Sequence, residues 1–381
     1  MTQVNLCVLR LPLKRVVEHS YPFHQATLDA LGVTSDNKRG LSLFFEELQD
    51  QRVTLLRLLK QEEALEEDID RALDQYLSNL PYLVIPHGDA EQTPLRNGFS
   101  FVWEDILCAT QSVVVKNVDL EMANLLLAVA LWKCHQGVTH MHYSEKGLTT
   151  AATAKSFLLY RKAIGIVEYC EHLLREKTAD ASHTERTDTD LRVITPLKHF
   201  IYAEIQGITV LRAIEKGNAP SLISSLAVDA QQRYEQSIEE EGMQASPDAF
   251  LHKLNAYASY KAACFRSYSL LYFAWTKLSG RAGGAAVRLA TEAEKIFEQA
   301  VALGTTYDKT SPETNSSERD VFHVSHFPSV SSRHGAHVIA EHSGESSKNS
   351  ETTIRERQQT CVLRSNSDRS ARAAAAETAD W

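Results

Sequence analysis

Apolar residues recur every three or four positions along most of the chain, which is the spacing of one face of an α-helix. From Asp36 this pattern predicts one long amphipathic helix or two, carried by Leu41, Phe44, Phe45, Leu48, Leu55, Leu59, Leu65, Ile69, Leu73, Tyr76 and Leu80. Between residues 82 and 98 Pro and Gly interrupt the pattern. The run YLVIP there predicts a loop or a short strand.

Further helices are predicted over residues 119–136, 147–177, the two halves of 191–241, 246–279 and 285–303. Asp119 is a candidate N-cap, and the apolar stripe that follows it predicts a helix buried on one side. Gly217 and Pro220 separate the two helices of a tight hairpin, since Gly ends helices and Pro begins them. The pattern predicts an all-α fold of stacked helix pairs similar to tetratricopeptide arrays, although no clean 34-residue repeat is present.

After about Asp308 the apolar periodicity stops, and Ser, Glu, Arg, His and Thr dominate the sequence. Such a composition buries too little apolar surface to offset the entropy of ordering the chain. We therefore expect one helical domain over residues 1–307 and a disordered tail over residues 308–381.

Composition narrows the classes of function. The formal net charge of −9 argues against general binding of nucleic acid, which needs a cationic surface. Six scattered cysteines without a paired spacing fit the reduced thiols of a cytoplasmic protein. The sequence contains no signal peptide, no apolar run long enough to span a membrane and no C-terminal prenylation box, so we expect any membrane contact to come from partners or from the surface.

Motifs for catalysis are missing. The sequence has no Gly-rich phosphate loop, GxSxG elbow, HExxH motif or paired Cys/His site, so we expect neither an enzyme nor a cofactor. Two groups of histidines are candidates for metal binding: His135, His140 and His142, and in the tail His323, His326, His334 and His337. Ordinary loop and tail histidines are the favoured interpretation because cysteine or carboxylate ligands at suitable spacing are missing, which leaves a metalloenzyme as a minor alternative.

The hairpin around Gly217 is a candidate binding element. Thr209 and Arg212 share one face of its first helix with Ile205, and Leu222 and Leu226 share one face of its second. These side chains are predicted either to line a groove between the helices or to lie in the core. Periodicity alone favours the core.

The hairpin also carries a family resemblance. Its run from Arg212 to Ala227 resembles the Bro domain family, most closely the Brox branch. Supporting matches occur in family order at Pro12–Lys14, Phe99–Asp105, Ala128–Trp132, Lys261–Phe265 and Glu292–Ala300. The family's additional terminal helix and extended segment have no counterpart after Tyr307, which leaves the end of the domain open.

The resemblance implies an elongated, curved helical domain that works without catalysis. It implies a cytoplasmic adaptor of the endosomal sorting (ESCRT) pathway, which binds the C-terminal amphipathic helix of an ESCRT-III subunit and is recruited to endosomal membranes, with peripheral membrane contact. The family's contact positions fall on Thr209, Leu222 and Leu226, and Arg212 is placed to meet acidic residues of the ligand. Thr209 is smaller than the Phe found in Alix, so a shallower groove is expected. The alternative is an architectural scaffold whose groove is lost or self-occupied.

Overall fold

The structure is a computed structural model that describes residues 9, 11–14, 35–61, 63–84, 94–107, 112–141, 150–177, 187–239 and 248–310. All of them belong to one of the two compact units into which the chain divides, Cys7–Phe322. The α-helices of this unit are α2 (Ser35–Leu59), α3 (Glu66–Asn79), α4 (Val118–His140), α5 (Thr150–Lys177), α6 (Leu191–Glu215), α7 (Pro220–Glu239), α9 (Ala249–Ser279) and α10 (Gly283–Thr310).

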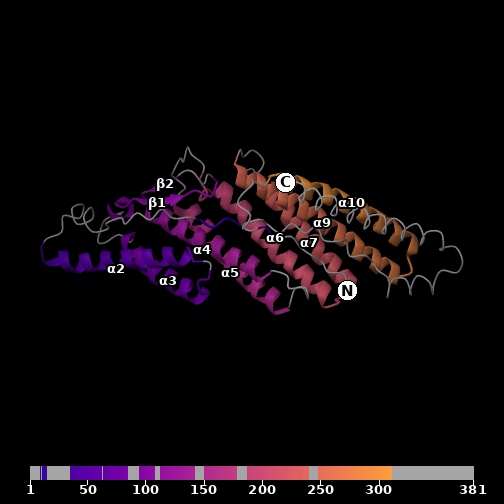
Figure 1. Cartoon of the computed structure of the whole chain (residues 1–381), viewed down its shortest axis with the longest axis horizontal. Helices are drawn as coiled ribbons and strands as arrows, with labels where there is room; N and C mark the ends of the chain where they lie inside the picture. Colours follow the sequence, from indigo (N-terminus) through magenta and orange to yellow (C-terminus); the bar gives the residue numbers. More distant parts are fainter. Residues whose placement is uncertain are drawn as a thin grey trace, which may run out of the picture. The chain divides into compact units, whose positions relative to one another are not determined.

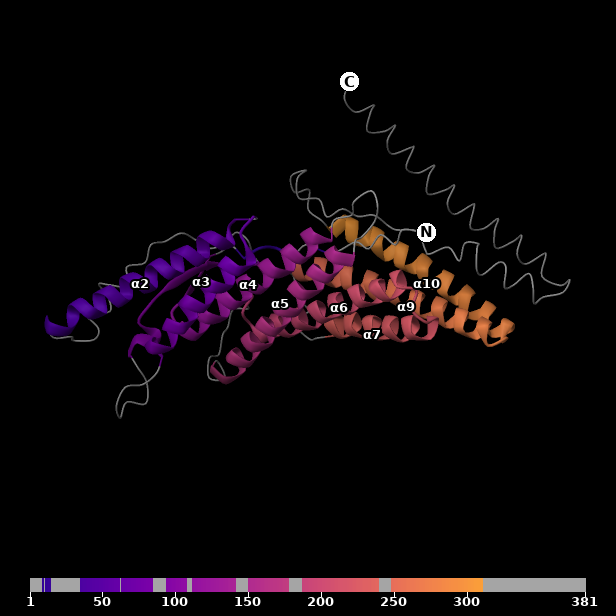
Figure 2. The ribbon, with the colours of Figure 1, turned by 90° about the horizontal axis from the view of Figure 1, so that it is seen from below.

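Consecutive helices pack against one another. Helix α2 packs on α3, α4 on α5, and α6 on both α5 and α7, while α9 packs on α7 and α10. The helices from α4 to α7 follow one another side by side in both views (Figures 1 and 2). The predicted all-α class with paired helices is therefore confirmed. Among the described residues, no helix is both long and apolar enough to cross a membrane.

The small β element lies elsewhere than the sequence predicted. Strand β1 (Phe101–Glu104) pairs antiparallel with β2 (Ser112–Val115), in a register that sets Phe101 opposite Val115. The YLVIP segment instead begins within a short 3-10 helix, Leu80–Leu83, in which Pro81 stands at the first turn and needs no N–H donor. A second 3-10 helix spans Pro94–Asn97. Buried and half-buried residues alternate along β1, but its first three residues, Phe-Val-Trp, are all apolar, so the sequence itself shows no alternation.

Helix α4 is buried on all sides rather than along one stripe, which corrects the amphipathic interpretation. Its N-cap is Asn117, whose side chain accepts a hydrogen bond of 2.7 Å from the backbone N–H of Asp119. Asp119 is not the cap; its carboxylate lies 2.6 Å from Arg96. The polar residues of α4 are therefore part of the interior, and each needs a partner there.

Two buried charges on α4 have such partners. Glu121 accepts hydrogen bonds from Arg52 Nε at 2.7 Å and from Trp103 Nε1 at 2.6 Å. Lys133, which is 1% exposed, donates to Glu66 at 3.1 Å and to Asp70 on α3. These contacts fix α2, α3 and β1 around α4.

Candidate partner-binding face

The hairpin of α6 and α7 is built by local signals in the sequence. Gly217 has a φ of 65°, a conformation that side chains disfavour, and its N–H bonds the carbonyl of Ile214 at 3.0 Å. Pro220 is the first residue of α7. The turn holds the two helices against each other, and α5 packs on the other side of α6.

The four predicted contact residues lie near this hairpin without being part of the core. Leu222 is 46% exposed, whereas its neighbour Ile223 is 2% exposed and faces inward. Leu226, Thr209 and Arg212 are half-buried. The core interpretation therefore fails for Leu222.

The contacts of Leu226 and Arg212 show that the outer surface of the hairpin is shared by three helices. Gln206 Nε2 on α6 donates to the carbonyl oxygen of Leu226 on α7 at 3.4 Å. On the other side of α6, the guanidinium of Arg212 lies 5.9 Å from the ring centre of Phe157 on α5. Among the described residues, no carboxylate lies within ion-pair distance of Arg212. The Glu215 carboxylate, one turn later, interacts electrostatically with Arg212 without forming an ion pair, so the guanidinium can still meet a ligand carboxylate.

Further along the same helices the contacts become polar. Tyr202 donates a hydrogen bond of 2.5 Å to Glu168, and this bond, with burial, raises the pKa of the Tyr202 hydroxyl. The guanidinium of Arg233 stacks 5.2 Å from the Tyr202 ring and pairs with Asp229 at 2.9 Å. We call the whole surface the three-helix face; its members are Phe157, Glu168, Tyr202, Gln206, Thr209, Arg212, Leu222, Leu226, Asp229 and Arg233.

A buried polar cluster supports the three-helix face from beneath. Glu204 is 3% exposed and accepts a hydrogen bond of 2.6 Å from the Tyr234 hydroxyl. Burial raises the pKa of Glu204, against the opposing effect of nearby Lys261 and of hydrogen bonds. A Cβ placed on Gly207 would lie 3.0 Å from the ring of Phe265 on α9. The close approach of α9 to α6 fixes the hairpin on the body.

A second polar cluster fixes α5 to α6. Glu171 on α5 accepts hydrogen bonds from Lys198 at 2.6 Å, from Thr195 at 2.8 Å and from Arg175 at 2.8 Å. Burial alone would raise the pKa of Glu171, but these hydrogen bonds outweigh it and hold the pKa at about 2. The charged carboxylate therefore stabilises the packing that builds the three-helix face.

The Glu171→Gln variant should be less stable than wild type at pH 7 by about 1 kcal/mol. This loss is smaller than the full pKa shift would give, because Arg175 and Lys198 reach solvent, which screens their charges. The pKa of Glu171 is depressed in the folded state, so its contribution is present above the ordinary value of 4.5 and is lost as pH falls toward about 2. Urea unfolding at pH 7 and at about pH 4 should show the difference narrowing at the lower pH. The matched control is Glu176→Gln, because the Glu176 side chain is 55% exposed; equal losses for both variants would contradict the role of Glu171.

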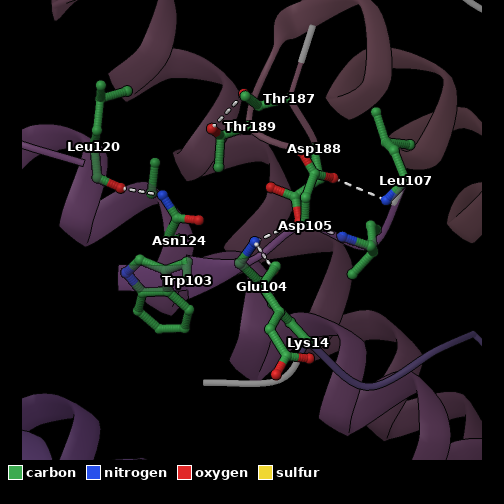
Figure 3. Close-up of polar contacts among 12 residues, drawn as sticks. Lys14, Trp103, Glu104, Asp105, Leu107, Leu120, Asn124, Thr187, Asp188 and Thr189 are labelled. Carbon is green, nitrogen blue, oxygen red and sulfur yellow. Dashed lines mark hydrogen bonds and ion pairs between the residues drawn. The ribbon is translucent and has the colours of Figure 1, made fainter. Parts of the chain in front are cut away.

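A third cluster joins segments that are distant in the sequence (Figure 3). Asp188, just before α6, accepts hydrogen bonds from the Lys14 ammonium and, at 3.0 Å, from the Ile106 N–H. Lys14 also donates to the carbonyl of Glu104 at 3.2 Å and lies 5.5 Å from the Trp103 ring centre. Burial and the Asp188 charge raise the pKa of neighbouring Asp105. We call Lys14, Asp105 and Asp188 the buried clasp.

The buried clasp gives a structural role to two of the segments that resemble the Bro domain family. Segments Pro12–Lys14 and Phe99–Asp105 meet in it although about 90 residues separate Lys14 from its partner on β1. Both therefore serve the attachment of the N-terminal segment and β1 to the start of α6.

Histidines and cysteines form no candidate metal centre in the described ranges, where no group of three or more His, Cys, Asp or Glu side chains is suitably placed. His135 and His140 lie near the end of α4; burial and Lys155 lower the pKa of His140. His142 and the tail histidines lie outside the described residues. Cys134, Cys170 and Cys264 are buried free thiols. Burial raises the thiol pKa to about 12 for Cys170 and about 11 for Cys264.

Sequence comparison identifies relatives of the chain. The mouse (Mus musculus) BRO1 domain-containing protein BROX is 26% identical over 295 residues, which cover 76% of this chain and 71% of the mouse protein. The human (Homo sapiens) BROX is 25% identical with the same coverage.

Solved structures share the fold. The BRO1 domain in a structure described as an ALIX BRO1 CHMP4C complex superposes with a TM-score of 0.62 at 12% identity, over 81% of this chain and 83% of that one. A structure described as the basis for endosomal targeting by the Bro1 domain gives 0.58 at 15% identity, over 81% and 82%.

A model of the BRO1-like domain family matches residues 9–358. The match runs past residue 307, where the sequence led us to expect the end of the domain, and residues 311–381 lie outside the described part. The chain belongs to the BRO1-like domain family, on the branch of the BROX proteins.

Proposed function

We propose that the three-helix face binds the C-terminal amphipathic helix of an ESCRT-III subunit, and that the protein is a non-catalytic adaptor of endosomal sorting. The observation that carries the proposal is the exposure of Leu222 beside half-buried Leu226 and Thr209 on the hairpin that carries the family resemblance. A related BRO1 domain in complex with CHMP4C, an ESCRT-III subunit, supports the kind of partner. The mode is that of an amphipathic helix whose apolar stripe packs on a helical surface.

The charges on the face suggest how the ligand is oriented. Arg212 rests on Phe157 and is available to an acidic side chain beside the ligand's apolar stripe. Leu222 and Leu226 would cover the stripe itself. At the other end of the three-helix face, Glu168 accepts a hydrogen bond from Tyr202, and Asp229 pairs with Arg233. This end is therefore suited to contact with polar residues of the ligand. Recruitment to endosomal membranes would then follow from the membrane-bound partner.

The direct test is titration of a fluorescent CHMP4C C-terminal peptide into the protein, with a scrambled peptide as control. Saturable binding of the native peptide alone is expected, and its absence would remove the proposal.

The Thr209→Phe variant should bind this peptide about 10-fold more tightly than wild type. Thr209 is half-buried, and its hydroxyl is occupied by a hydrogen bond of 2.9 Å to the Ile205 carbonyl. A phenyl ring there adds apolar area to the contact at about 25 cal/mol per Å² buried. Fluorescence anisotropy measures the change, and Val228→Phe is the control, because Val228 is 38% exposed on a different side of α7 from Leu222 and Leu226. Unchanged or weaker binding by Thr209→Phe would place the ligand elsewhere.

A further inference from the structure

Helix α9 and the start of α10 have an unusual charge composition. Residues 249–291 contain no Asp or Glu, although the chain as a whole carries a formal net charge of −9. The same stretch contains six basic residues, Lys253, Lys261, Arg266, Lys277, Arg281 and Arg288. Lys261 is buried beneath the hairpin, so its charge is used internally. The others give this part of an acidic protein a local positive charge.

The outer side of α9 combines this charge with apolar side chains. Arg266, Leu270, Phe273 and Lys277 are spaced by four, three and four residues, which places them on one side of the helix. Phe273 is 39% exposed, and the ammonium of Lys277 lies 4.7 Å from its ring centre. Arg266 is exposed and Leu270 half-buried. We call these four residues the α9 stripe.

The turn between α9 and α10 and the start of α10 also expose basic and apolar side chains. Arg281 and Arg288 are exposed, as is Val287 (60%). Within the described ranges, no carboxylate oxygen lies within 4.0 Å of the basic groups of Arg266, Lys277, Arg281 or Arg288. Four cations that pair with no described carboxylate therefore lie on one helical hairpin with the exposed side chains of Phe273 and Val287.

We propose that the α9 stripe and the α9–α10 turn dock on the surface of a lipid bilayer that contains anionic lipids. Phe273 is suited to the interface between headgroups and acyl chains, where aromatic rings are favoured. The long side chains of Arg266 and Lys277 reach lipid phosphates while their stems cover the apolar residues. Each cation near an anionic surface raises the binding constant about fivefold, so four give an appreciable affinity.

A nucleic acid fits this surface less well. Binding to a phosphate backbone uses cations and gains nothing from aliphatic side chains such as exposed Val287 and half-buried Leu270. The proposed membrane contact also does not depend on the three-helix face, because it involves different side chains.

The test is co-sedimentation of the full chain with vesicles of phosphatidylcholine alone and of phosphatidylcholine mixed with phosphatidylserine. Binding is expected only to the mixed vesicles and should weaken with added salt. The Arg266→Glu/Lys277→Glu variant should bind them at least tenfold more weakly. Lys116→Glu/Lys216→Glu is the control with the same change in net charge, since both lysines are exposed outside the α9–α10 hairpin; it should stay within about twofold of wild type.

A second variant separates charge from apolar contact and guards against misfolding. Phe273→Ser keeps every cation and should bind the mixed vesicles about threefold more weakly, with an unchanged circular dichroism melt. Equal binding by the Arg266→Glu/Lys277→Glu variant and its control would overturn the proposal, as would equal binding to both vesicle types. Tighter binding to single-stranded RNA than to mixed vesicles would also overturn it. Leu222→Asp should retain vesicle binding, which distinguishes a failure here from a failure of the partner-helix function.

Discussion

Replacement of Leu222 by Asp is expected to weaken binding of the CHMP4C C-terminal peptide about 100-fold. Leu222 is the most exposed of the four contact residues, and burial of a leucine side chain against a ligand contributes about 1.5–3 kcal/mol. Aspartate loses that contribution and adds a charge that must lose water on binding. Because the native side chain is 46% exposed, the fold itself should lose little stability. Anisotropy titration gives the affinity, and a thermal melt checks the fold.

Val228→Asp is the matched control for this experiment. Val228 also lies on α7 and is 38% exposed, but six residues of helix rotate it to a different side from Leu222. It should bind the peptide with an affinity close to that of wild type. Equal losses for the two variants would indicate a general effect of charge on α7, and no loss for Leu222→Asp would remove this residue from the binding site.

The hairpin was predictable because its signals are local. Gly217 and Pro220 mark the turn in the sequence, and the end of α6 at Glu215 and the start of α7 at Pro220 follow from them. The exposure of Leu222 was not predictable from periodicity. Leu222 and Ile223 are adjacent apolar residues, and only the positions of α6 and α9 decide which of them faces inward.

The burial of α4 was missed for a related reason. Its stripe of Leu and Ala residues predicts one apolar side, and its polar residues were expected to meet solvent. Their partners lie far away in the sequence. Arg52, the partner of Glu121, is 69 residues away from it, and Glu66, a partner of Lys133, is 67 residues away. Pairings at such separations leave no periodic trace in one sequence. The family resemblance recovered the candidate face, but not the clusters of Glu204, Glu171 and Asp188 that hold its helices in place.

The buried clasp should contribute strongly to stability, and Asp188→Ala is expected to lower the free energy of unfolding by about 3 kcal/mol. The variant leaves the Lys14 ammonium, which is 1% exposed, without its carboxylate. Among the described residues, its remaining hydrogen-bond acceptor is then the Glu104 carbonyl at 3.2 Å. Loss of Asp188 also removes one cause of the raised pKa of Asp105, so ionised Asp105 should offset part of the cost. Urea unfolding at pH 7 measures the change, with Asp68→Ala as the control.

Asp68 provides the contrast because its partner Arg71 is 67% exposed, and an exposed ion pair contributes under about 1 kcal/mol. A further comparison tests the cause directly. If the loss in Asp188→Ala arises from an uncompensated buried charge, then removing that charge as well in Lys14→Met/Asp188→Ala should restore part of the stability. A double variant that is less stable than Asp188→Ala would show that Lys14 stabilises the clasp through its contacts with Glu104 and Trp103 even without Asp188. In either case the clasp acts at the start of α6, the helix that carries Thr209 and Arg212, so stability lost there should also weaken the packing of the three-helix face.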